Sequence, residues 1–118
     1  MVAGDWPVVP TALHCSLMSR AVQTAAPIAE ALGLEVHGHA ELFEVGGPLD
    51  WSGDDADPRR AHPGSAAADL SALTPRLVLP SQAQQDGWWA GPVEAGPQSV
   101  ARAARVVAWL RERYARSD

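Results

Sequence analysis

Arg20 is the residue whose type and position most clearly indicate chemistry, because it follows a segment predicted to change from strand to helix. Residues 12–15 form a short, mostly apolar run typical of a buried strand. We expect the Ser16 side chain to accept hydrogen bonds from the first N–H groups of a helix that begins near Leu17. Backbone donors, the positive end of the helix dipole and a guanidinium would then converge, which favours an anion site and above all a phosphate site. The alternative for Arg20 is the commoner role of a charged side chain, namely solvation or pairing with a surface carboxylate.

The segment around Arg20 also resembles a motif of a known family. Residues 16–25, Ser-Leu-Met-Ser-Arg-Ala-Val-Gln-Thr-Ala, resemble the Ser-x-Leu-x-Arg-Ala-x-Gln-Thr-Ala segment of the histidine phosphatase superfamily, the phosphoglycerate-mutase-like proteins. Met18 stands where the family usually has leucine, and Leu17 where it often has proline. Shorter matches follow in the family's order at residues 28–34, 42–47, 87–89, Glu94 and 101–106. The resemblance covers most of residues 12–116 and is weakest across 48–80.

The resemblance implies phosphoryl transfer through a phosphohistidine. In the family, a histidine of an Arg-His-Gly motif attacks phosphorus, arginines and a second histidine hold the phosphoryl oxygens, and an acidic side chain protonates the leaving oxygen. Arg20 matches the phosphate-clamping arginine, so it is expected to serve both catalysis and substrate binding. Glu44 matches the proton donor, a role that a pocket shielded by apolar groups would favour; its alternative is a surface carboxylate beside a turn. The expected substrate is a small phosphorylated metabolite, with hydrolysis and mutase-type transfer both open.

Two of the family's motifs have no counterpart in this sequence. None of the four histidines, at positions 14, 37, 39 and 62, follows an arginine and precedes a glycine, and no Ser-His-Gly-like motif occurs. The sequence therefore resembles the middle of a histidine phosphatase domain with both ends absent. We expect no turnover of phosphomonoesters by this polypeptide alone, although by resemblance the intact domain is a phosphatase or phosphomutase.

Two alternative functions and one expectation about self-association accompany this interpretation. One alternative function is a non-catalytic module of the same fold, which binds phosphate or a partner through Arg20 and a loop at Trp88 and Trp89. The remaining alternative is an unrelated α/β interaction domain. Strands left without neighbours would expose unpaired edges, so self-association through those edges is expected.

Two main helices are predicted on either side of a long irregular region. The first runs from Leu17 to Leu32, with Pro27 inside it and Gly33 as a left-handed stop. The second runs from about residue 98 to residue 114, where apolar residues recur at helical spacing.

The predicted fold class is α/β, in one partial domain over residues 1–118. A second strand is predicted at 34–39, and the resemblance implies a partial three-layer α/β/α arrangement with a short, mostly parallel sheet. Residues 46–80 are rich in glycine and proline and are predicted to be a long loop or insert. A short helical turn is expected near residues 69–73.

No metal ion or cofactor is expected. His37 and His39 share one face of a predicted strand, but no third ligand is evident, so surface histidines are the favoured interpretation. The acidic residues between positions 50 and 57 lack the spacing of a calcium-binding loop. Cys15 is the sole cysteine, which excludes an internal disulfide, and we expect it to act as a small buried hydrophobe.

Composition limits the class of partner. The net charge of −5 argues against a general nucleic-acid-binding protein. All nine basic residues are arginines, so any phosphate contact must be made by a guanidinium. No apolar run approaches the length of a membrane span, and the N-terminus does not resemble a signal peptide. A cytoplasmic location is therefore expected, with no membrane partner.

Overall fold

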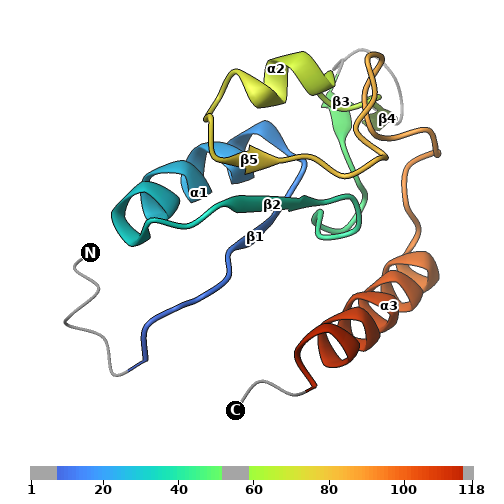
Figure 1. The fold of residues 1–118 in the computed structure, drawn as a ribbon. Helices are drawn as coiled ribbons and strands as arrows, with labels where there is room; N and C mark the ends of the chain where they lie inside the picture. Colours follow the sequence, from blue (N-terminus) through green and yellow to red (C-terminus); the bar gives the residue numbers. More distant parts are fainter. Residues whose placement is uncertain (1–7, 52–58, 116–118) are drawn as a thin grey trace. The chain divides into compact units, whose positions relative to one another are not determined.

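Two compact units make up the chain (Figure 1). The computed structural model describes residues 8–51 and 59–115. The first unit comprises residues 1–43 and 63–90, and the second comprises residues 44–62 and 91–118. None of the helices in the described ranges is long and apolar enough to cross a membrane.

A three-stranded parallel sheet with the order β1-β2-β5 is the centre of the first unit (Figure 1). Its strands are β1 (His14–Ser16), β2 (Val36–His39) and β5 (Leu77–Val78). Helix α1 (Ser19–Leu32) connects β1 to β2 and packs against both strands, because parallel neighbours require a crossover that returns the chain to the same end of the sheet. Helix α2 (Ala67–Ser71) precedes β5. The predicted α/β class and the parallel sheet are therefore confirmed.

Different residues determine the two ends of α1. The helix begins at Ser19 rather than near Leu17, with Met18 as its N-cap residue in extended conformation. It ends as predicted at Gly33, whose φ of 67° and ψ of 32° are left-handed, and the Gly33 N–H donates to the carbonyl of Ala29. Pro27 lies within the single continuous helix.

The buried face of α1 is formed by small residues. Val22, Ala25 and Ala29 are buried at helical spacing. The sequence predicts that Ala21, Ile28 and Leu32 share one face with Ala25 between them. Ala25 is buried as predicted, but the other three residues are only half-buried. Small residues form the buried face because alanine allows the helix backbone to approach Val36 of β2. Ala25 and Ala29 form one hydrophobic cluster with Val36.

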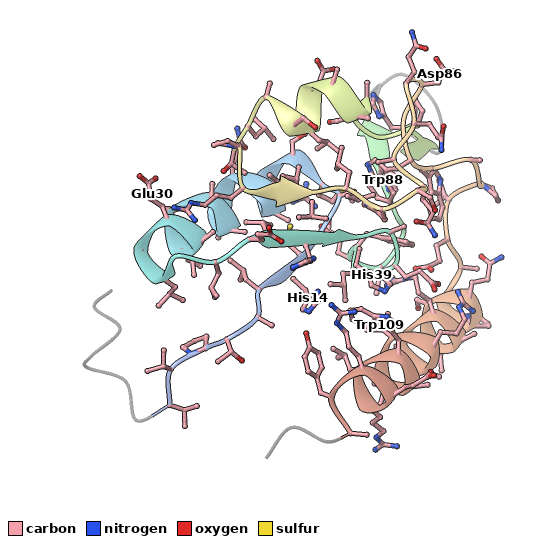
Figure 2. The ribbon with its side chains drawn as sticks, viewed as in Figure 1. His14, Glu30, His39, Asp86, Trp88 and Trp109 are labelled. Carbon is pink, nitrogen blue, oxygen red and sulfur yellow. The ribbon has the colours of Figure 1, made fainter. Side chains whose placement is uncertain are left out.

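A second hydrophobic cluster in the first unit gathers residues from distant parts of the sequence. It contains Leu17, Val22, Phe43, Leu70 and Trp88. The rings of Phe43 and Trp88 lie 5.8 Å apart and those of Phe43 and Trp89 lie 4.9 Å apart, between centroids. Trp88, labelled in Figure 2, is buried and Trp89 is half-buried, so both tryptophans take part in the packing of the first unit.

The second unit contains a β-hairpin and the longest helix of the described residues. Strands β3 (Leu49–Trp51) and β4 (Arg59–Ala61) pair antiparallel. Helix α3 (Gly96–Tyr114) starts with proline in its first turn, and the Gln98 side chain accepts a hydrogen bond from the Ala95 N–H at 2.8 Å. The sequence predicts a long loop over 46–80 with a short helical turn near 69–73. Helix α2 lies close to that turn, whereas β3, β4 and β5 also form within the predicted loop, of which residues 52–58 lie outside the described residues.

Candidate functional site

Arg20 is the second residue of α1 and lies just beyond the carboxyl end of β1. The residue is exposed, and no acidic side chain occupies the first turn of α1. Only Leu17 and Met18 separate the strand from the helix, so the end of β1 fixes where this first turn lies. The Arg20 guanidinium therefore extends from the positive end of the helix dipole, where an anion is favoured.

Two serines organise the backbone around this first turn. Ser16 Oγ accepts a hydrogen bond from the Met18 N–H at 3.3 Å. The prediction that Ser16 caps the helix is therefore wrong, because Ser16 closes the turn that precedes the helix and α1 has no side-chain cap. Ser19 Oγ lies 2.6 Å from Ser65 Oγ, which ties the first residue of α1 to the segment before α2.

Glu44 opens a tight turn in the second unit. The Gly47 N–H donates to the carbonyl oxygen of Glu44 at 3.2 Å, so residues 44–47 form one hydrogen-bonded turn. Gly46 and Gly47 have φ values of 100° and 83°, a region that residues with a Cβ rarely adopt. Glu44 is exposed at this turn. The two predicted site residues thus belong to different units, Arg20 to the first and Glu44 to the second.

A buried ion pair lies beside the Glu44 turn. Arg102 Nε donates to Glu94 Oε2 at 2.8 Å, and Arg102 Nη2 donates to Glu94 Oε1 at 2.9 Å. The side chains are 9% exposed for Arg102 and 5% exposed for Glu94. The Arg102 hydrogen bond, opposed in part by burial, holds the pKa of the Glu94 carboxyl below its usual value, with help from the Arg102 charge, the Gly46 N–H and Arg105. Arg102 and Arg105 belong to the family's pattern, and an outward salt bridge is the default expectation for both. Arg102 does form an ion pair, but it is buried, so the outward orientation is wrong for Arg102.

The family model for the histidine phosphatase superfamily (branch 1) matches residues 6–118 of the chain. The chain belongs to the histidine phosphatase superfamily. No curated protein and no solved structure matches it significantly. The three parallel strands and three helices are consistent with a partial phosphoglycerate-mutase-like fold, as the resemblance implies.

Three of the four histidines of this superfamily member lie on the neighbouring strands β1 and β2. His14 of β1 and His37 of β2 are register partners, and their ring centroids lie 5.5 Å apart (Figure 2 labels His14). His37 Nε2 lies 3.6 Å from Glu35 Oε2, and His39 Nδ1 accepts a hydrogen bond from the Glu41 N–H. Within residues 8–51 and 59–115, no group of three histidine, cysteine or acidic side chains could hold a metal ion.

The Cys15 thiol is placed in β1 with its side chain partly covered. Burial raises its pKa to about 11 from the ordinary value of 9.0. A thiol with a raised pKa carries little thiolate at neutral pH and is a poor nucleophile.

Sequence reasoning assigned Glu94 to the family pattern without a role. The signal that could have indicated one is its position just before Gly96 and Pro97, which begin a helix. A carboxylate at that place lies near the start of α3 and can meet an arginine in the next turns, as Arg102 does.

Proposed function

We propose that this chain is a histidine phosphatase-type domain whose Arg20 binds the phosphoryl group of a small phosphorylated metabolite. The observation that carries the proposal is the family match over residues 6–118, which includes the segment of Arg20. The exposed location of Arg20 in the first turn of α1 supports it. A guanidinium fork suits the paired oxygens of a phosphoryl group.

Glu44 is proposed as the side chain that protonates the leaving oxygen in the family's phosphohistidine mechanism. Its match to the family motif supports this role, and its place at the start of the tight 44–47 turn gives the carboxyl a defined backbone. Hydrolysis and mutase-type transfer use the same acid, because each must neutralise the oxygen that departs from phosphorus.

A second function is favoured by one specific feature, which is that no Arg-His-Gly motif occurs in these 118 residues. In-line phosphoryl transfer by the family's route needs a histidine nucleophile at that motif. We therefore expect the 118-residue polypeptide to bind the oxyanion without turning over a phosphomonoester, as a non-catalytic module would.

The experiment compares oxyanion binding with turnover in the same samples. Vanadate affinity would be measured by isothermal titration calorimetry for the natural chain, Arg20→Ala, Arg20→Lys and the control Arg111→Ala, an exposed arginine of α3. Loss of a charge-assisted bidentate contact should weaken binding at least about tenfold in Arg20→Ala, less in Arg20→Lys and not in the control. An aryl phosphate assay should give no turnover. Equal vanadate affinity in Arg20→Ala and the natural chain would refute the site, and turnover lost in Arg20→Ala would refute the inactive state.

A further inference from the structure

The turn that carries Glu44 is held by a residue far away in sequence. The Glu94 N–H donates to the carbonyl oxygen of Gly46 at 2.9 Å. The Gly46 N–H donates in return to Glu94 Oε1 at 3.4 Å. Both backbone groups of Gly46 are thus bonded to Glu94, and Gly46 lies two residues from Glu44 and inside the same turn.

Arg102 fixes the carboxylate that makes one of these bonds. Its guanidinium holds both oxygens of Glu94 at 2.8 and 2.9 Å, which sets the plane of the carboxylate as well as its position. Arg102 comes from α3, which is 19 residues long, so the support is a rigid element. Arg105 adds positive charge from the same helix.

Burial makes this arrangement more than a surface ion pair. The Glu94 and Arg102 side chains are 5% and 9% exposed, and Gly46, Gly47 and Pro48 are buried beside the exposed Glu44. Breaking a pair that is shielded from water is strongly unfavourable, because it leaves a buried charge without its partner. The exposed Glu44 is therefore attached to a turn whose other half is buried and bonded to this pair.

We propose that Glu94, braced by Arg102, is a positioning residue for Glu44. It holds Gly46 so that the 44–47 turn presents the Glu44 carboxyl in one direction. The functional meaning of this rests on the proposed role of Glu44 as proton donor, because an acid must be held within about 0.5 Å of its productive geometry.

Nuclear magnetic resonance of the full 118-residue chain tests the proposal. The variants are Glu94→Ala, Glu94→Gln, which keeps an acceptor for the Gly46 N–H without the charge, and the control Glu112→Ala, an exposed carboxylate of α3. Amide hydrogen exchange would be read at Gly46 and Gly47, and the three-bond HN–Hα coupling, which reports the backbone φ angle, would be read at Glu44. Circular dichroism would confirm that α3 is formed; if Glu94→Ala lacks α3, Glu94→Asp replaces it, since aspartate keeps the charge but is one methylene shorter.

Glu94→Ala should speed exchange at Gly46 and Gly47 at least about tenfold, because the Gly46 N–H loses its acceptor, Glu94 Oε1, and only the backbone bond from residue 94 to the Gly46 carbonyl remains. The Glu44 coupling should move toward the averaged value of a mobile backbone. Glu94→Gln keeps one acceptor but loses one of the two Arg102 contacts, so it should restore part of both effects. The control should change neither. Unchanged exchange at Gly46 and an unchanged Glu44 coupling in Glu94→Ala would overturn the proposal, as would a Gln variant identical to Ala. Vanadate titration of the same samples separates this proposal from the proposed oxyanion site at Arg20. Failure to bind vanadate would refute the Arg20 site, whereas the measurements at Gly46 and Glu44 alone decide the role of Glu94.

Discussion

Replacement of Arg102 by methionine should be among the most destabilising single changes in the second unit. Methionine keeps much of the aliphatic volume but removes both donors to Glu94, at 2.8 and 2.9 Å. The Glu94 carboxylate, whose side chain is 5% exposed, would then be buried without its counter-charge. Breaking a buried pair in this way typically costs about 3–5 kcal/mol, whereas an exposed pair is worth about 0–1 kcal/mol. Because the free energy of unfolding of a small domain is about 5–15 kcal/mol, the loss is a large part of the total.

Urea unfolding followed by far-UV circular dichroism at pH 7 measures this loss. The double variant Glu94→Gln/Arg102→Met removes the stranded charge and should recover part of the stability. Arg111→Met, an exposed arginine of the same helix, should change the free energy of unfolding by less than about 0.5 kcal/mol. A change below about 1 kcal/mol for Arg102→Met would refute the argument, because the pair would then behave as a surface pair.

The pH dependence of this effect has a definite sign. The pKa of Glu94 is lowered in the folded chain from an ordinary value of 4.5, mainly by the hydrogen bond from Arg102. The unfolded state therefore binds a proton first as the pH falls. The stability contributed by the pair is present above pH 4.5 and is lost as the pH falls through the lowered pKa, so the natural chain and Arg102→Met should converge in acid.

The remaining predictions concern the first unit. Gly87→Ala should lower the free energy of unfolding by about 3 kcal/mol or more in thermal unfolding, because Gly87 has a φ of 119° and an added Cβ would overlap the Pro63 carbonyl. Gly33→Ala should cost only about 1–2 kcal/mol, because Gly33 is left-handed but an added Cβ would meet open space. Equal losses would contradict the packing at Gly87. Because its pKa is raised to about 11, Cys15 should react with an aryl disulfide reagent at pH 8 about a hundredfold more slowly in the folded chain than in the urea-unfolded chain. The folded chain should also lose stability as the pH rises from 9 toward 11, since the thiol of the unfolded chain ionises first. A folded thiol as reactive as the unfolded one would show that the hydrophobic clusters of the first unit do not cover it.

Local signals account for the elements that sequence predicted well. Gly33 ends α1 because glycine adopts left-handed φ without strain, and Pro97 begins α3 because the first turn of a helix needs no N–H from that residue. Strand β2 follows from the alternation around Val36, which is fully buried.

Tertiary packing accounts for what sequence missed. The face of α1 is chosen by the close approach to Val36, which favours Ala25 and Ala29 over the larger Ile28 and Leu32. In α3 the apolar periodicity does not predict burial, because Val100 is 71% exposed while Arg102 is buried. Strands β3 and β4 are each three residues long and carry too little periodicity to be distinguished from a loop.

Within the candidate site, the sequence indicates residues of a continuous motif but not contacts between residues that are distant in sequence. Arg20 was found because its motif is continuous in sequence, and the structure places it in the first turn of α1. The link between Glu94, Gly46 and Arg102 joins residues 48 and 8 positions apart, and no short-range pattern encodes it. The roles of Arg20 and Glu44, self-association through strand edges and the cytoplasmic location stay predictions.

The measurement that tests the central claim most directly is a phosphate titration of the ¹⁵N-labelled chain, followed by amide chemical shifts. If Arg20 and the first turn of α1 form an oxyanion site, saturable shifts should concentrate at Ser19, Arg20 and Ala21 and should be lost in Arg20→Ala but retained in Arg111→Ala. Shifts that leave the first turn of α1 unmoved, or that persist in Arg20→Ala, would contradict the account.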